Sequence, residues 1–583
     1  MNILSSENRL LNSVFKKFLF GTVIAILCTI LGVIANGIII GNFFGKLGLS
    51  AFALTTPVVY GFLAISYIFS YGGSIVCSNN FADKNRINNN FSVVCILAFL
   101  IGALLTISAM FPTQVALMLG ASKESTASVS DYLGGYLLGI IPTMFVSILN
   151  NYSRIDGFPN LGLKTGLILF SSNVALDFVF LLVFKTNIYG VGLATALSNY
   201  IAFIFLLRHF LSEKSSFRFK KNLEFKNEFK EIFRSGLAAS LNQLYNMVRT
   251  MITNRLAMMV GGLIFLGAMS VQSNVYMLLC TLGVGIGTST LALSGIFYGE
   301  KDKIQLEQLL RLSVLNALIL ISIISIILLI FAPYFVYAFG KNPEVYDTAI
   351  RGLRIFAFSL PFSALCYILM NFYNATKQQA IANYISFAHS FLFLSFFATV
   401  LAFAIGGDGI WISFVLCEIV TLLTLPLVIR IKTKKFPRKL EDYILMEDNI
   451  FPKKDTYFAY IESEEELLDI VENIDEKLLN NDLDTKTLLK IRLVVEEMGK
   501  NIFEHAYGEN QTKLLNLRIR YRNTDKIIIY FQDNGIPFDL KKGHENDGEF
   551  YGIDIIRGIS DDVEYNYNVK LNNNKIIIPI DKR

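Results

Sequence analysis

Glu497, Asn501 and His505 follow one another at intervals of four residues in the stretch VVEEMGKNIFEHAYG. Residues four apart lie on one face of an α-helix, so a helix here would align a carboxylate, an amide and an imidazole. The Asn501 amide oxygen is a ligand type that Mg²⁺ accepts alongside water and phosphate oxygens. Glu497, one turn earlier, could act as a general base toward a water or hydroxyl. This polar face suits a soluble nucleotide site.

Two segments further along the chain add groups that could hold a nucleotide. In QDNGIPFD, the Asp533 carboxylate could accept the exocyclic amine of adenine, and Gly535 would let the backbone approach the ring. In NDGEFYGIDIIRGI, Gly548 and Gly552 would let backbone amides at the start of a helix meet phosphates. The three segments together predict a site for an adenine nucleotide with Mg²⁺.

A second group of polar residues lies inside apolar segments. Asp177 falls near the middle of the apolar run 164–184, where an ionisable group in a bilayer costs roughly 2.5–3.5 kcal/mol and indicates function. Asn173 precedes it by one helical turn, so both side chains share a face. Three residues in neighbouring runs complete the predicted ion or substrate group: Tyr132, Asn150 and Thr195.

The second half of the apolar region has its own candidates. Arg249 belongs to a polar stripe at helical spacing, formed by Asn242, Asn246, Arg249 and Thr253. Glu418 lies at mid-depth of the last apolar run, and depth alone suggests that it pairs with Arg249. His389 is interpreted as a structural residue.

Composition divides the chain into a membrane body and a soluble tail. Hydrophobic residues make up 53% of the 583 residues, and runs of about 20 apolar residues, long enough to cross a bilayer, occur only in residues 1–440. Residues 441–583 hold 19 Lys+Arg and 30 Asp+Glu, a net charge of −11, whereas residues 1–440 hold the remaining 33 and 17, a net charge of +16. Opposite charge and opposite hydropathy indicate separate domains.

The apolar region contains about twelve membrane-length runs. Basic residues are concentrated in alternate loops, about 25 on one side against about four on the other, so the positive-inside rule places both termini in the cytoplasm. We therefore expect a multi-pass protein of the plasma membrane. The runs lie near 18–41, 51–78, 91–111, 131–152, 164–184, 190–211, 235–260, 263–297, 311–338, 350–374, 380–404 and 409–431.

The two halves of this region look like repeats. Pro142 and Pro361 lie 219 residues apart in similar contexts, and Gly190 and Gly409 share the same offset. Asn36 and Asn254 correspond at an offset of 218. We therefore expect a six-helix lobe at 1–220 and a second at 221–440, including a basic linker. Repeated lobes with a site between them are typical of transporters.

This arrangement, with GGSIVCSNNFADKN after the second run and SSNVALDFVFLLV through the fifth, resembles the MATE (multidrug and toxic compound extrusion) family over roughly residues 12–432. The resemblance implies export of small molecules coupled to H⁺ or Na⁺. It assigns the coupling-ion site to Asp177, Asn173, Asn150, Tyr132 and Thr195. One position departs from the family, because Asn36 stands where the first span usually carries an acid.

The tail has the pattern of an α/β two-layer sandwich. Residues 463–479 and 485–508 have helical periodicity, 516–535 alternates and turns like a β-hairpin, and 568–580 predicts a final strand. The ordered motifs resemble the GHKL type of ATP-binding domain over about 455–581, and EHAYG, DNGIPFD and NNNKIIIPI resemble its anti-sigma-factor serine-kinase branch.

The resemblance implies that ATP and Mg²⁺ bind here, with Mg²⁺ on Asn501, a general base at Glu497, adenine at Asp533 and the remaining nucleotide contacts at Gly535, Gly548 and Gly552. The third motif departs from the family, because Glu549, Phe550 and Tyr551 occupy its usually glycine-rich middle. Residues 440–490 contain no histidine, which excludes the phosphoacceptor of an ordinary histidine kinase.

Three functions remain open from the sequence. The first is an ion-driven exporter of small, lipophilic cations with an ATP-binding tail that regulates it or phosphorylates a cytoplasmic protein. The second is a membrane-anchored kinase or switch whose transporter-like body senses a ligand. The third is a flippase for a lipid-linked precursor. A small molecule, membrane lipid and a protein target are the expected partners, and no nucleic acid is expected.

Overall fold

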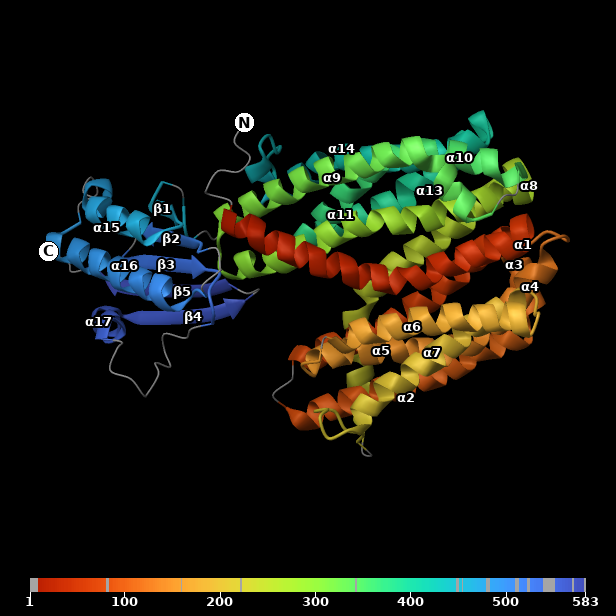
Figure 1. The fold of residues 1–583 in the computed structure, drawn as a ribbon, viewed down its shortest axis with the longest axis horizontal. Helices are drawn as coiled ribbons and strands as arrows, with labels where there is room; N and C mark the ends of the chain where they lie inside the picture. Colours follow the sequence, from red (N-terminus) through yellow and green to blue (C-terminus); the bar gives the residue numbers. More distant parts are fainter. Residues whose placement is uncertain are drawn as a thin grey trace.

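The computed structural model describes residues 9–79, 83–158, 160–220, 223–340, 343–446, 450–452, 454–478, 483–508, 513–521, 525–537, 551–568 and 571–580. Helices α1–α14 form an elongated body, and a small domain built around a sheet lies at one end of it (Figure 1).

The helices of the first half of the body are interrupted by short 3₁₀ and π segments. They are α1 (Arg9–Asn79), α2 (Lys84–Thr106), η2 (Ile107–Met110), α3 (Pro112–Met118), α4 (Thr126–Tyr136), η3 (Leu137–Gly139), α5 (Ile140–Ile155), α6 (Asn160–Phe178), the π turn η4 (Val179–Val183) and α7 (Ile188–Leu211).

The second half repeats this plan. Its elements are α8 (Phe225–Gly299), α9 (Lys303–Ala338), α10 (Pro343–Ala357), α11 (Leu360–Ala375), α12 (Gln379–Phe387), the π turn η5 (Ala388–Leu392), α13 (Phe393–Ile405) and α14 (Gly407–Thr433). A 3₁₀ turn, η6 (Leu440–Tyr443), comes after α14.

Two pairs of residues show that the halves are structural repeats. The long helices α1 and α8 are each bent at one glycine, Gly45 (φ 56°, ψ −140°) and Gly262 (φ 59°, ψ −148°). Positive φ favours glycine because it has no Cβ. Asp83 and Asp302, which are 219 residues apart, cap the next helices, α2 and α9. We call residues 9–220 the N-lobe and residues 223–433 the C-lobe.

Nine helices in the described part of the chain are long and apolar enough to span a membrane, or ten if α10 and α11, bent by 51°, form one broken span. Two of them, within α1 and α8, contain the glycine bends. Counting the broken span and dividing each of these two bent helices gives twelve spans, the number expected. The count itself remains a prediction.

The two long helices pack reciprocally across the lobe boundary. The first half of α1 contacts the second half of α8, and the first half of α8 contacts the second half of α1. A Cβ on Gly285, in the second half of α8, would lie 2.6 Å from Val23 in the first half of α1. Reciprocally, a Cβ on Gly72, in the second half of α1, would lie 2.2 Å from the carbonyl oxygen of Ile232 in the first half of α8. Glycines therefore permit close helix contact at both crossings.

The C-terminal domain is an antiparallel five-stranded sheet in the order β1-β2-β3-β5-β4. Helices α15 (Glu464–Leu478), α16 (Thr485–His505) and α17 (Tyr551–Ile559) share a hydrophobic core with one face of it (Figure 1). The strands are β1 (Thr456–Ile461), β2 (Leu515–Arg520), β3 (Lys526–Asp533), β4 (Asp562–Asn568) and β5 (Leu571–Pro579).

The predicted two-layer tail is confirmed. Both long helices, the hairpin of β2 and β3, and the final strand lie where the sequence pattern places them. Strands β1 and β4 were not predicted. In β2 and β3, apolar residues such as Leu517 and Ile529 face the helices, while Arg518, Tyr530 and Gln532 alternate with them on the opposite face.

Candidate functional site

The C-terminal domain has a cavity between α16 and the sheet, with about 400 Å³ of empty space that includes open solvent. Four residues of α16 line one side of it: Met498, Asn501, Ile502 and His505. Asp533 at the end of β3 and two residues of β5, Asn572 and Asn574, line the other.

Asp533 is fixed at the base of this cavity. It is 1% exposed, and its Oδ1 accepts hydrogen bonds of 2.8 Å from the Gly535 backbone N–H and 2.8 Å from the Asn572 side-chain amide. Burial raises the pKa of Asp533 to about 6, and the two hydrogen bonds act in the opposite direction. Neither bond uses Oδ2, so this oxygen can accept an exocyclic amine.

Gly535 allows the loop after β3 to contact the end of α16. A Cβ at this position would lie 2.5 Å from the carbonyl oxygen of Ala506, and the next residue, Ile536, donates its backbone N–H to that oxygen at 2.8 Å. Any larger residue would push the loop away from the helix. The close approach in the structure is made to the end of α16, and the predicted approach of the Gly535 backbone to an adenine ring stays a prediction.

Only part of the predicted polar face of α16, formed by Glu497, Asn501 and His505, lines the cavity. Asn501 and His505 line it, and the Asn501 Nδ2 atom is buried with no hydrogen-bond partner in the described part of the chain. Glu497 is half-buried on the same helix but is not among the lining residues, so its role as a base stays a prediction. Gly552 lies in the first turn of α17, and Gly548 falls outside the described residues.

Sequence reasoning missed the contribution of β5 to the cavity. Asn572 bonds both Asp533 and the carbonyl oxygen of Ile536, at 2.8 Å each. The signal was the Asn run in NNNKIIIPI, in which alternate members point to opposite faces of a strand. The Asn501 amide nitrogen, which has no partner among the described residues, and the Asp533 carboxylate, whose two hydrogen bonds described above both use Oδ1, fit an adenine nucleotide, with the Asn501 Oδ1 atom as a ligand for Mg²⁺.

The N-lobe contains the predicted polar group inside the membrane body. The Thr195 hydroxyl oxygen on α7 accepts hydrogen bonds from Asn36 on α1 at 3.0 Å and from Asn173 on α6 at 3.3 Å. Asp177, one turn after Asn173, is 0% exposed. Neither of its carboxylate oxygens has a hydrogen-bond partner within the described residues, and the Asn36 Oδ1 atom is equally unpartnered.

Unpartnered buried oxygens are rare because they lose solvation without compensation. A carboxylate with this surrounding is suited to hold a proton or a cation that prefers oxygen ligands. Tyr132 is also buried in this lobe, with its ring edge-on to Phe52 at 5.8 Å.

Two membrane predictions are corrected. Asn150 does not join the group around Asp177: its Oδ1 lies beside Gly162, near the opposite end of α6, about 22 Å away along the helix at 1.5 Å per residue. Glu418 makes no ion pair with Arg249 among the described residues and lies instead 3.3 Å from His389. Asn254 bridges the lobes by donating to the Ala53 carbonyl oxygen at 2.8 Å.

Two repeated lobes of membrane-length helices, each with a buried acid, define a multi-pass membrane transporter fold, here joined to an ATPase-like domain. Residues 21–179 and 238–400 match the model of the MatE family. The matched residues exceed half of the chain, so the protein belongs to this family. Residues 461–578 match the histidine kinase-like ATPase domain.

Curated relatives and solved structures agree with this assignment. The chain is 23% identical over 377 residues to the multidrug export protein MepA of Staphylococcus saprophyticus, covering 63% of this chain and 83% of that protein. It is 30% identical over 239 residues to MepA of Staphylococcus aureus strain MSSA476, covering 39% and 52%.

Two conformations of a multidrug resistance MATE family transporter share the fold of the body at 20% identity. The inward-facing conformation gives a TM-score of 0.64 over 71% of this chain and 100% of that chain. The outward-facing conformation gives 0.59 over 72% and 95%.

Proposed function

We propose that this protein is a secondary-active exporter of small, lipophilic cationic compounds in the plasma membrane, driven by H⁺ or Na⁺. The observation that carries the proposal is Asp177, a fully buried carboxylate whose two oxygens have no hydrogen-bond partner within the described residues. The MatE family assignment and the multidrug export function of the named relatives support it.

The chemistry of export follows from competition for one negative charge. Asn36, Asn173 and Thr195 offer neutral oxygens around Asp177, and Asn36 brings no charge of its own. A proton or Na⁺ that binds Asp177 cancels the attraction of this lobe for a cationic compound, and loss of that ion restores it. The lobes would exchange the ion for the cationic compound in one orientation and the compound for the ion in the other. The ion and the compound would therefore cross the membrane in opposite directions.

Transport in proteoliposomes tests this step. We expect an imposed proton or Na⁺ gradient to drive efflux of tetraphenylphosphonium. The ion whose gradient drives efflux is the coupling ion. Asp177→Asn should abolish efflux, while Ser171→Ala, on an exposed position of the same helix, should keep it. Efflux by Asp177→Asn at the wild-type rate would refute the proposed role.

The second part of the proposal is that the C-terminal domain lies in the cytoplasm and binds ATP with Mg²⁺. The positive-inside bias supports its location, and the cavity around Asp533 and Asn501 supports its ligand. Glu497 would serve as the base if the domain phosphorylates a serine or threonine of a protein target.

Calorimetry on the full-length protein in nanodiscs tests nucleotide binding. Mg²⁺-ATP should bind the wild type and Glu465→Gln, an exposed control on α15. Asn501→Ala and Asp533→Asn should each remove binding. A folded protein that binds no ATP would leave the domain as a docking module only.

The third part is that nucleotide binding regulates the transporter, and the interface between domain and body supports it. Arg518 of β2 forms an ion pair with Asp302, the residue that caps α9, and both are almost fully buried. The Tyr530 hydroxyl donates to Glu300 at 2.7 Å, and the Gln305 amide donates to Gln532 at 3.4 Å. Burial raises the pKa of Glu300, although Tyr530 and Arg518 act against this shift.

The same two strands serve the nucleotide cavity and this interface. On β3, Asp533 faces the cavity while its neighbour Gln532 faces the body. On β5, Asn572 bonds Asp533, while Asn573 accepts a hydrogen bond from Gln532 at 2.9 Å. A shift of these strands on nucleotide binding would therefore reach α9 directly, with a coupling free energy of about 1–3 kcal/mol.

Transport measured with and without ATP on the domain side tests regulation. We expect ATP to change the efflux rate of the wild type, and deletion of residues 441–583 to remove the ATP effect while efflux continues. An ATP effect that survives the deletion would contradict this part.

A further inference from the structure

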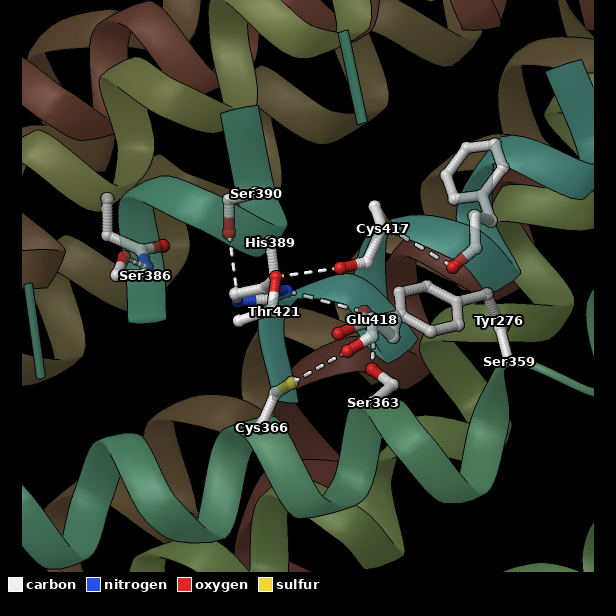
Figure 2. Close-up of polar contacts among 12 residues, drawn as sticks. Tyr276, Ser359, Ser363, Cys366, Ser386, His389, Ser390, Cys417, Glu418 and Thr421 are labelled. Atoms are coloured by element: carbon white, nitrogen blue, oxygen red, sulfur yellow. Dashed lines mark hydrogen bonds and ion pairs between the residues drawn. The ribbon is translucent and has the colours of Figure 1, made fainter. Parts of the chain in front are cut away.

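The C-lobe buries an acid and an imidazole against each other. Glu418 on α14 is 6% exposed and His389 in η5 is 4% exposed, with 3.3 Å between Glu418 Oε1 and His389 Nδ1 (Figure 2). The π turn that carries His389 interrupts the helical ladder between α12 and α13. Such single π turns occur frequently at functional sites.

The second imidazole nitrogen contacts a group that tolerates either protonation state. His389 Nε2 lies 3.0 Å from the Ser390 hydroxyl (Figure 2). A hydroxyl donates to a neutral imidazole nitrogen and accepts from a protonated one, after rotation about a single bond. His389 can therefore gain or lose a proton without displacement of any heavy atom.

The Glu418 carboxylate favours a positive charge on the neighbouring His389 imidazole. Its Oε2 atom is buried and has no hydrogen-bond partner in the described part of the chain. A buried carboxylate with one unsatisfied oxygen is costly unless a positive charge lies beside it. One proton on His389 makes the pair neutral overall, so the pair is built to hold one proton.

Other titratable groups surround the pair on three helices. Thiols and phenols are ordinarily neutral near pH 7, and Arg249 carries a fixed charge, so the carboxylate and the imidazole are the members expected to exchange protons. The surrounding groups are Arg249, Tyr276 and Cys280 of α8, Cys366 and Tyr367 of α11, and Cys417 of α14.

A polar stripe connects the pair to the first half of α8. The Asn242 amide donates to the Ser386 hydroxyl at 2.8 Å, one turn before His389, and Asn246 donates to Asn242 at 3.0 Å. Asn242 and Asn246 are half-buried. Hydroxyls of this kind can relay protons together with water, and the side-chain amides can hydrogen-bond that water.

We propose that the Glu418–His389 pair is a second proton-carrying site of transport, located in the C-lobe and independent of Asp177. It rests on the proposed export of cations. A proton from a hydronium ion adds to the lone pair of His389 Nε2 and points to the Ser390 hydroxyl oxygen, while the Nδ1–H stays directed at the Glu418 carboxylate. When a cationic compound approaches Glu418 Oε2, the proton returns to water, and no other bond forms or breaks.

Histidine NMR on the full-length protein in nanodiscs tests the site without any transported compound. The chain has four histidines, and His389→Gln identifies the signal of His389. We expect this signal to respond to pH, because the imidazole is the proton carrier of the pair. Glu418→Gln should change that response, because it removes the carboxylate beside the imidazole, whereas Asp177→Asn should leave it unchanged. A His389 signal that does not titrate would overturn the proposal.

Proton release tests the role in transport. Tetraphenylphosphonium added to the detergent-solubilised protein in weak buffer should release protons from the wild type. Asp177→Asn and Glu418→Gln should each lower the number released, and the double variant should release none. Ser413→Ala, a buried polar residue of α14, is the matched control.

The two proposals fail differently. If Asp177→Asn alone abolished proton release and Glu418→Gln released as many protons as the wild type, the second site would be overturned. The proposed exporter function would stand. No proton release and no gradient-driven efflux by the wild type would contradict proton-coupled export. A titrating His389 would then be a buried proton site without a role in transport, which overturns the inference as stated.

Discussion

The N-lobe and the C-lobe are repeats, yet they bury their acids on different helices. Asp177 lies on α6 with no hydrogen-bond partner for either oxygen in the described chain, whereas Glu418 lies on α14 against His389. At the repeat offset of 219, Asp177 corresponds to Phe396 (177 + 219) and Glu418 to Asn199 (418 − 219). The two lobes share the repeated backbone, but their buried acids lie at positions that do not correspond.

The π turns explain how this divergence is possible. In the N-lobe the π turn Val179–Val183 comes after Asp177, but in the C-lobe the turn Ala388–Leu392 precedes Phe396. Each π turn accommodates one extra residue and rotates the helix beyond it by about 100°. Asp177 consequently points inward with 0% exposure, while Phe396 is 58% exposed.

The lobes differ also at the residues that cap α2 and α9, the helices that succeed the two bent ones. Asp83 caps α2 at the surface, and Asp302 caps α9 beneath the C-terminal domain, where it meets Arg518. The same capping position has become an attachment point in one lobe only. The comparison teaches that the duplicated backbone was kept while buried charges were redistributed.

The sharpest test of the comparison is to remove each acid in turn. Asp177→Asn should reduce efflux below detection at every pH, because no second charge lies in its polar group. Glu418→Gln should reduce efflux partially and change its pH profile, because Asp177 remains. Efflux in proteoliposomes between pH 6 and 8 measures both, and identical profiles for the two variants would refute the proposed division of roles.

The capping residues provide the next test. Asp302→Asn removes the ion-pair partner of the buried Arg518 and leaves Glu300 as the nearby acid, which should cost up to about 3 kcal/mol. In contrast, Asp83→Asn replaces one good helix cap by another and should cost less than about 0.5 kcal/mol. Hydrogen exchange of the β2 amides should accelerate only in Asp302→Asn.

A double variant provides the control for this difference. Replacing both Asp302 and Arg518 by Met removes the charges together and should recover most of the loss. Equal exchange rates in the Asp302 and Asp83 variants would mean that the domain docks without the ion pair.

The shared glycine bends should respond alike. Gly45→Ala and Gly262→Ala force a Cβ into positive φ and should each destabilise the protein by about 1–3 kcal/mol. No atom of the described residues lies within 4 Å of a Cβ at Gly262, so the cost expected there is backbone strain. Thermal unfolding in detergent measures it, with Gly295→Ala, a helical position with open space, as control. If only one of the two substitutions lowered the thermal stability, the two bends would not be equivalent.

The nucleotide site should depend on pH through Asp533. Its folded pKa of about 6 lies above the ordinary 3.8, and a proton on Oδ2 weakens this oxygen as an acceptor for the adenine amine while Oδ1 already accepts two hydrogen bonds. ATP affinity should therefore fall about tenfold from pH 7.5 to pH 5. Stability of the domain without ligand should change in the opposite direction, rising as pH falls through 6. Calorimetry with adenosine, which has no phosphates to titrate, separates the effect of Asp533 from that of ATP.

The sequence by itself determined the local structure and its chemistry. The periodicity of 485–508 predicted α16, and helical spacing placed Asn501 with His505 and Asp177 with Asn173 on common faces. Motif order identified the ATP-type domain, and repeated glycines and prolines identified the lobes. These features follow from short-range geometry, because one helical turn or one strand alternation is fixed by a few neighbouring residues.

Only the tertiary structure decided which distant groups meet. The partner of Glu418 is His389, not Arg249, because the packing of α14 on η5 sets that contact. Asn572 was brought beside Asp533 by the pairing of β3 with β5, and Arg518 beside Asp302, 216 residues away, by docking of the sheet. Asn150 has the right type and depth pattern, yet the length of α6 separates it from Asp177. Such contacts depend on the packing of whole elements, which sequence spacing does not encode.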